Sequence, residues 1–154
     1  MARDPIWLRK LAEAYFDASK HADLPLDDDD PRDQNCNRAD AVVSQVLGLL
    51  PDEPEDCWRF IQIACELKPS VEQLGLLGAG IFEDLMDEFG EQFIDRIEVL
   101  AAVNPALQTV VDGAWTMSMP LQIAERIEAI QTGPVAADNR VRRDWWLAQK
   151  DRKV

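Results

Sequence analysis

The sequence predicts an all-α protein, and three observations support this prediction. Apolar residues recur at spacings of three and four along most of the chain, as they do on one face of a helix. Prolines, glycines and helix-capping residues divide the chain into short segments. No stretch alternates apolar and polar residues between hairpin turns, as strands would. We therefore expect a compact bundle of seven to nine short helices.

The N-terminal third of the chain predicts two helices and a loop. A first amphipathic helix is expected over residues 5–20. The stretch 21–36, with two prolines and a run of four aspartates, is expected to be a flexible acidic loop. Asn37 can cap a second helix, which Pro51 would end.

Two residue pairs have the spacing of a capping box, in which two side chains each accept from the other's backbone N–H. Asp52 and Glu55 would open a third helix in this way. Ser70 and Gln73 would open the next one, which runs toward Gly78. Both pairs predict where helices begin.

Glycine and proline mark the later helices. The helix that starts near Ile81 is expected to stop at Gly90 in a left-handed cap. Asn104 and Pro105 form a cap and first turn, and Pro120 begins another helix. A solenoid-like repeat of helix pairs is a second option, although no clean period supports it. Seven apolar residues are expected in one core: Trp58, Ile61, Phe93, Ile97, Leu100, Val111 and Trp115.

Charge is distributed unevenly along the chain. The whole chain has a formal net charge of −13, while residues 140–154 carry a net charge of +4 and the preceding residues −17. We therefore expect an acidic helical domain over residues 1–133 and a basic helical segment over 134–154 that packs on it. The acidic domain would repel nucleic-acid phosphates and would attract a basic protein.

The composition also indicates the cellular compartment of the protein and whether a metal or cofactor site is expected. No apolar run approaches the roughly 18 residues of a membrane-spanning helix, and no signal peptide precedes the first helix. Cys36, Cys57 and Cys65 are odd in number and lack a Cys-x-x-Cys pair, which favours reduced thiols in a cytoplasmic protein. With His21 as the one histidine, no metal site and no cofactor are expected. The oligomeric state is left open.

The most informative segment is the acidic run between residues 83 and 98, where Arg96 is the one cation. Together with Trp146, its carboxylates are expected to form the face that binds a basic partner. The alternative is a solvated face that serves solubility alone. The seven carboxylates are Glu83, Asp84, Asp87, Glu88, Glu91, Asp95 and Glu98.

Two adjacent tryptophans stand in the basic segment. Neighbouring side chains on a helix point about 100° apart, so Trp145 and Trp146 rarely face the same core. Trp145 shares a face with Val141 and Ala148 and is expected to pack, which leaves Trp146 more exposed. Alternatively, the basic segment folds onto the acidic domain and buries both rings.

Several short motifs stand between residues 58 and 115. They are Trp58-Arg59-Phe60-Ile61, Leu77-Gly78-Ala79-Gly80-Ile81-Phe82-Glu83-Asp84-Leu85-Met86, Phe89-Gly90, Ile94-Asp95-Arg96-Ile97-Glu98, Ala101, Asn104-Pro105 and Trp115. These motifs resemble those of a family of small bacterial proteins that is known only as a domain of unknown function. Ile81-Phe82 replace a usual Pro-Leu, and Phe89 replaces a usual histidine. The resemblance implies no activity.

Two classes of function fit this sequence. The first is a non-catalytic module that binds and inhibits a basic protein, for example an immunity protein against a toxin or an inhibitor of a nucleic-acid-acting effector. The second is a small helical enzyme that uses Glu83, Asp84 or Glu98 as acid, base or metal ligand. We favour the first, because no catalytic signature surrounds these carboxylates.

Overall fold

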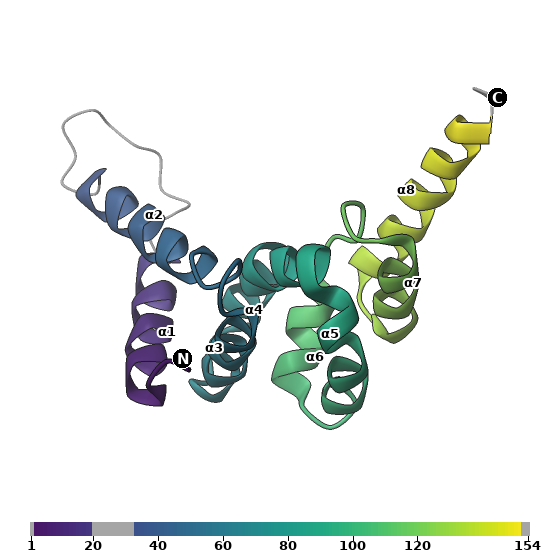
Figure 1. Ribbon diagram of the computed structural model, residues 1–154. Coiled ribbons are helices and arrows are strands. Elements are labelled where there is room, and N and C mark those ends of the chain that lie inside the picture. Colours follow the sequence, from purple (N-terminus) through teal and green to yellow (C-terminus); the bar gives the residue numbers. More distant parts are fainter. Residues whose placement is uncertain (1, 20–32, 152–154) are drawn as a thin grey trace. The chain divides into compact units, whose positions relative to one another are not determined.

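The computed structural model describes residues 2–19 and 33–151 (Figure 1). These residues form eight α-helices and one π-helical segment, with no strand, which confirms the all-α prediction and the expected number of helices. The repeat of helix pairs is not confirmed. The elements are α1 (Pro5–Ser19), α2 (Asp33–Leu47), α3 (Pro54–Glu66), α4 (Val71–Leu77), η1 (Gly78–Phe82), α5 (Glu83–Ala101), α6 (Pro105–Gly113), α7 (Leu121–Ile130) and α8 (Pro134–Asp151).

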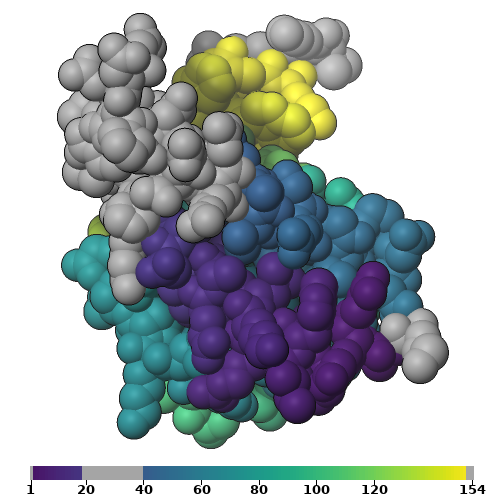
Figure 2. Space-filling view, turned by 90° about the vertical axis from the view of Figure 1, so that its left-hand side faces the viewer, coloured from purple at the N-terminus to yellow at the C-terminus, as the bar shows by residue number. Residues whose placement is uncertain are grey.

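The helices form two compact units, Met1–Gln73 and Leu74–Val154. In the first unit α1 contacts both α2 and α3, and Figure 2 shows α1 and α2 side by side. In the second unit α5 contacts η1, α6 and α7, while α8 contacts α6 and α7. The boundary that the charge distribution predicts at residue 133 stays a prediction. No described helix has the length and apolar character needed to cross a membrane.

The first unit is built around aromatic and aliphatic side chains of α1 and α3. Leu8 and Phe60 are fully buried, and the ring of Tyr15 meets that of Phe60 edge-on at 5.8 Å. Asp56 is buried at the start of α3, where it accepts a hydrogen bond from the backbone N–H of Arg3. These contacts hold the N-terminal segment against α3.

Helix starts in the first unit agree only in part with the sequence. The Ser70–Gln73 capping box is confirmed, because each side chain accepts from the other residue's backbone N–H at 3.0 and 3.1 Å. The predicted Asp52–Glu55 box is wrong: Glu53 precedes α3 without a side-chain cap, and Pro54 supplies the first turn. The predicted cap at Asn37 is also wrong, because α2 already begins at Asp33. His21 and the four aspartates 27–30 lie outside the described residues.

Close approach of helices shapes the second unit. A side chain on Gly78 would place its Cβ 2.0 Å from the carbonyl oxygen of Val110, so glycine lets η1 touch the backbone of α6. The predicted stop at Gly90 is wrong. Helix α5 continues through it after a kink at Phe89, and a Cβ on Gly90 would lie 2.7 Å from Cγ2 of Ile123. Gly90 therefore admits α7 rather than ending a helix.

Other predictions for this unit are confirmed. Asn104 Oδ1 accepts hydrogen bonds from the first backbone N–H groups of α6, and Pro120 precedes α7. Five of the seven expected core residues are buried, each within its own unit. Leu100 and Trp115 are only half-buried, so their assignment to the core was wrong.

Candidate functional site

Helix α5 carries the seven predicted carboxylates. Its apolar residues, among them Leu85, Phe93 and Ile97, are buried against the rest of the second unit. The spacing of these residues turns the acidic positions outward. Asp84, Glu88, Glu91 and Asp95 are exposed, whereas Glu83, Asp87 and Glu98 are half-buried.

Two carboxylates at the C-terminal end of α5 form ion pairs with a cation of the same chain. Arg126 of α7 donates two hydrogen bonds to Glu98, at 2.8 and 2.6 Å, and one to Asp95 at 2.6 Å. The hydrogen bonds from Arg126 lower the pKa of Glu98, and those to Glu98 and Asp95 raise the pKa of the Arg126 guanidinium. These residues join α5 to α7, and both carboxylates share one cationic partner within the chain.

Glu83 is tied to the segment that follows α6. Its Oε2 accepts a hydrogen bond of 3.2 Å from the backbone N–H of Trp115. Desolvation is the largest influence on its pKa and raises it, the hydrogen bond from Trp115 opposes this, and repulsion from Asp84 and Asp87 adds to the rise. Glu83 thus holds the start of α5 in place.

Four carboxylates remain, and we call Asp84, Asp87, Glu88 and Glu91 the α5 carboxylate group. Within the described chain, no residue donates a hydrogen bond to them or pairs with them. The pKa of Asp84 is raised by desolvation first and then by repulsion from Asp87 and Glu88. The group is therefore a concentration of negative charge that the described chain does not neutralise.

The carboxylates proposed for an enzyme do not converge. Glu83 and Glu98 are fifteen positions apart on α5, which corresponds to about 22 Å along the helix. Asp84 lies beside Glu83 and is equally remote from Glu98. Among the residues that the structure describes, no three histidine, cysteine or carboxylate side chains are grouped as metal ligands would be.

Helix α8 corrects the prediction for the two tryptophans. Trp145 is 64% exposed and Trp146 42% exposed, so neither the packing of Trp145 nor the burial of both rings was right. The face of α8 that packs contains Ala136 and Asn139, and Val141 is exposed with Trp145. Trp146 instead lines a hollow of about 330 Å³ between α8 and the segment before α7.

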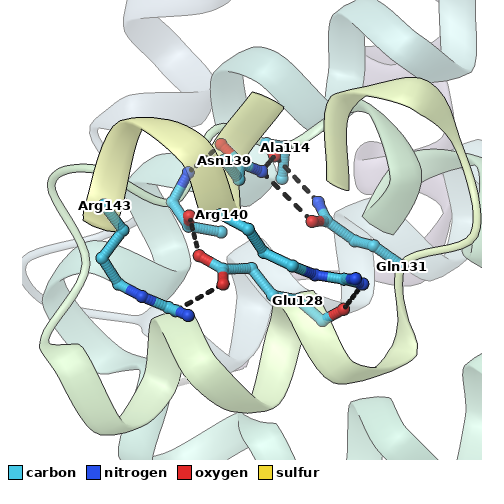
Figure 3. Close-up of polar contacts among 7 residues, drawn as sticks. Ala114, Glu128, Gln131, Asn139, Arg140 and Arg143 are labelled. Carbon is cyan, nitrogen blue, oxygen red and sulfur yellow. Dashed lines mark hydrogen bonds and ion pairs between the residues drawn. The ribbon is translucent and has the colours of Figure 1, made fainter. Parts of the chain in front are cut away.

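A buried polar network, which the sequence analysis missed, anchors α8 (Figure 3). Glu128 of α7 forms an ion pair with Arg143 and accepts a hydrogen bond of 2.7 Å from the Thr116 hydroxyl. Its backbone carbonyl accepts a hydrogen bond from Arg140. Glu128 is only 2% exposed, so this carboxylate depends on Arg143 and Thr116 for its charge to be tolerated.

Asn139 completes this network. Its side chain accepts from the backbone N–H of Thr116 at 3.2 Å and donates to the carbonyl of Ala114 and the side chain of Gln131. Gln131 also donates to Ala114. The spacing of Ala136, Asn139 and Arg143 is three and four, so this face could have been recognised from the sequence.

Comparison with protein families identifies the relationship. Residues 30–135 match the family model described as Family of unknown function (DUF6869). The chain belongs to this family. The match confirms the resemblance that the motifs indicate, and no curated protein and no solved structure matches the chain.

In this DUF6869 chain several of the motif residues have structural roles. Gly78 and Gly90 allow helices to approach closely, and Glu83 accepts a hydrogen bond from the backbone of Trp115. Asn104 caps α6. The motif residue that carries charge without such a task is Asp84, a member of the α5 carboxylate group.

Proposed function

We propose that this DUF6869 protein is a non-catalytic interaction module that binds a basic partner protein through the α5 carboxylate group. One observation carries the proposal. Asp95 and Glu98 are paired with Arg126, whereas the four carboxylates of the group have no cationic partner among the described residues. Helix α5 therefore carries acidic residues that pair with another helix and acidic residues that have no cationic partner in the described chain.

The open carboxylates repel one another. Residues three and four apart on a helix are neighbours, and like charges at these spacings lower stability by about 0.2–0.5 kcal/mol per pair. Asp84 and Asp87, Asp84 and Glu88, and Asp87 and Glu91 have these spacings. A cationic surface would relieve the repulsion and would raise the rate of encounter.

Arg126 illustrates the contact that a partner would make. Its guanidinium binds two carboxylates of α5 at once, with hydrogen bonds of 2.6–2.8 Å. Arginines on a partner could bind Asp87 and Glu91 in a similar manner, because residues three positions apart, like Asp95 and Glu98, or four apart, like Asp87 and Glu91, are neighbours on a helix. A protein whose basic surface binds nucleic acid, such as a toxin or another nucleic-acid-acting effector, has this chemistry. Binding would then block that surface.

The chain would serve this function without direct contact with nucleic acid. Its net charge of −13 repels phosphates, so competition with nucleic acid would occur on the partner. Inhibition of an effector, in the way that an immunity protein inhibits its toxin, is the more specific function that we propose.

Acid–base chemistry at the start of α5 is the second candidate. Desolvation raises the pKa of both Glu83 and Asp84, which is a feature of some catalytic carboxylates. Two-dimensional NMR titration would follow each carboxyl group. A midpoint displaced toward neutral pH by an added small molecule would favour this candidate, and unchanged midpoints would count against it.

Parallel capture from the native host tests the interaction proposal. The bait proteins are the wild type, the double variant Asp87→Lys with Glu91→Lys, and a control variant Asp40→Lys with Glu72→Lys. None of these four side chains has a hydrogen-bond or ion-pair partner among the described residues, and both variants change the net charge by the same amount. We expect a basic protein to be retained by the wild type and by the control variant and lost from the α5 variant. Equal retention by all three baits would contradict the proposal.

A further inference from the structure

Helix α8 and the segment before α7 leave an apolar surface open. Apolar side chains on a protein surface usually stand singly, and a cluster of them marks a contact site. Here five large apolar side chains belong to α8, to the start of α7 and to the segment before α7. They are Met117, Leu121, Val141, Trp145 and Trp146, and each is at least 42% exposed.

These side chains border a groove beside α8. One hollow of about 330 Å³ lies between the segment before α7 and the last turns of α8. A second hollow of about 380 Å³ shares Met117 with the first and is also lined by Val141, Arg142 and Trp145. We call the first hollow the α8 groove, which is lined by Met117, Met119, Leu121, Ala124, Trp146 and Leu147.

Cations stand beside both hollows. Lys150 lines the α8 groove, with its Nζ 3.8 Å from the centre of the Trp146 ring, and Arg142 lines the second hollow, 4.6 Å from the centre of the Trp115 ring. Neither cation pairs with a carboxylate of the described chain. Arg143 also borders the groove, but Glu128 neutralises it. The groove is thus apolar inside and positive at its edge, in a chain that is otherwise strongly acidic.

We propose that the α8 groove docks an amphipathic helix of a partner protein, one that carries carboxylates beside its apolar anchors. Helices bind apolar grooves through residues spaced by three and four, and methionines adapt to such anchors. Tryptophan is enriched among the residues that dominate binding energy. Carboxylates of the partner would reach Arg142 and Lys150.

Charge decides between this occupant and a second copy of the chain. In a symmetric contact between two α8 helices the same surface of both copies meets, so the interface would gather Arg142 and Lys150 twice and bring like charges together. An acidic helix meets them without repulsion. The inference does not depend on the α5 carboxylate group, and a protein with both surfaces could bridge two partners of opposite charge.

The test is selection from a displayed library of random sixteen-residue peptides against the full-length chain. We expect the selected peptides to have net negative charge and apolar residues at helical spacing. Their synthetic consensus should bind at least tenfold more weakly to Trp146→Ala and to the double variant Arg142→Glu with Lys150→Glu. Trp7→Ala is the matched control, because Trp7 is also an exposed tryptophan with a cation, Arg3, over its ring.

Each remaining outcome counts against the proposal. A basic consensus, no consensus, or a consensus that binds Trp146→Ala as well as the wild type would overturn it. So would a dimer in light scattering that Trp146→Ala abolishes, or a blue shift of tryptophan fluorescence caused by phosphatidylserine vesicles. The Asp87→Lys with Glu91→Lys variant should bind the acidic consensus as the wild type does, so the two proposals can fail separately.

Discussion

Replacement of Asn139 by alanine tests how α8 is held. The substitution removes three hydrogen bonds and leaves the backbone N–H of Thr116 and the side-chain oxygen of Gln131 without their partners. The carbonyl of Ala114 keeps its bond from Gln131. Each buried polar group left unsatisfied costs about 1–3 kcal/mol, so for the two groups we expect a loss of about 2–6 kcal/mol in the free energy of unfolding.

Asp138→Ala is the matched control for this experiment. Asp138 precedes Asn139 on α8 but is exposed, so its replacement should change stability by less than about 0.5 kcal/mol. Urea denaturation followed by circular dichroism gives both values, and hydrogen exchange should show faster exchange of the Thr116 amide in Asn139→Ala alone. If the two variants differ by less than about 0.5 kcal/mol, the buried network does not hold α8 as described.

Two further predictions concern packing and pH. Gly78→Ala should destabilise the protein by about 3 kcal/mol, because the new Cβ would meet the Val110 carbonyl at 2.0 Å. Gly75→Ala has open space at its Cβ and should stabilise the protein by about 0.5–1 kcal/mol. Thermal unfolding measures both changes. Equal effects would refute the close approach of η1 to α6. The pKa of Glu83 is raised, which means that the folded state binds its proton more tightly. This contribution to stability is therefore present below the ordinary glutamate pKa of 4.5 and is lost as pH rises through the folded pKa. Glu83→Gln should therefore be more stable than the wild type at pH 7 in urea denaturation and should lose this advantage in acid; no difference at pH 7 would contradict the burial of its charge.

Local capping signals in the sequence predicted some helix starts and not others, since the Asp52–Glu55 box and the Asn37 cap are absent. The cap at Asn104 and the box at Ser70 depend on residues two or three positions away, and both are present. Gly90 failed as a helix stop because its neighbour in space is Ile123, far along the chain. A glycine that ends a helix and one that admits another helix look alike until the packing partner is known.

The acidic site was predicted only in outline. The sequence places seven carboxylates on one helix, but their spacing cannot show that Arg126 of α7 pairs with Asp95 and Glu98. On α8 two faces have spacings of three and four, and hydrophobicity alone favours the face of the larger apolar residue, Trp145. The other face, with Asn139, is the buried one, because a polar network can satisfy groups that hydrophobicity alone would place outside.

The most direct test of the account is the rate at which the captured basic partner associates with the chain across a salt series. For the wild type we predict a rate constant that falls steeply as salt increases, and for Asp87→Lys with Glu91→Lys a rate at least tenfold lower at low salt with a flatter salt dependence. The control Asp40→Lys with Glu72→Lys should stay close to the wild type. Association that is insensitive to salt and equal in all three proteins would show that the α5 carboxylate group is only a solvated surface.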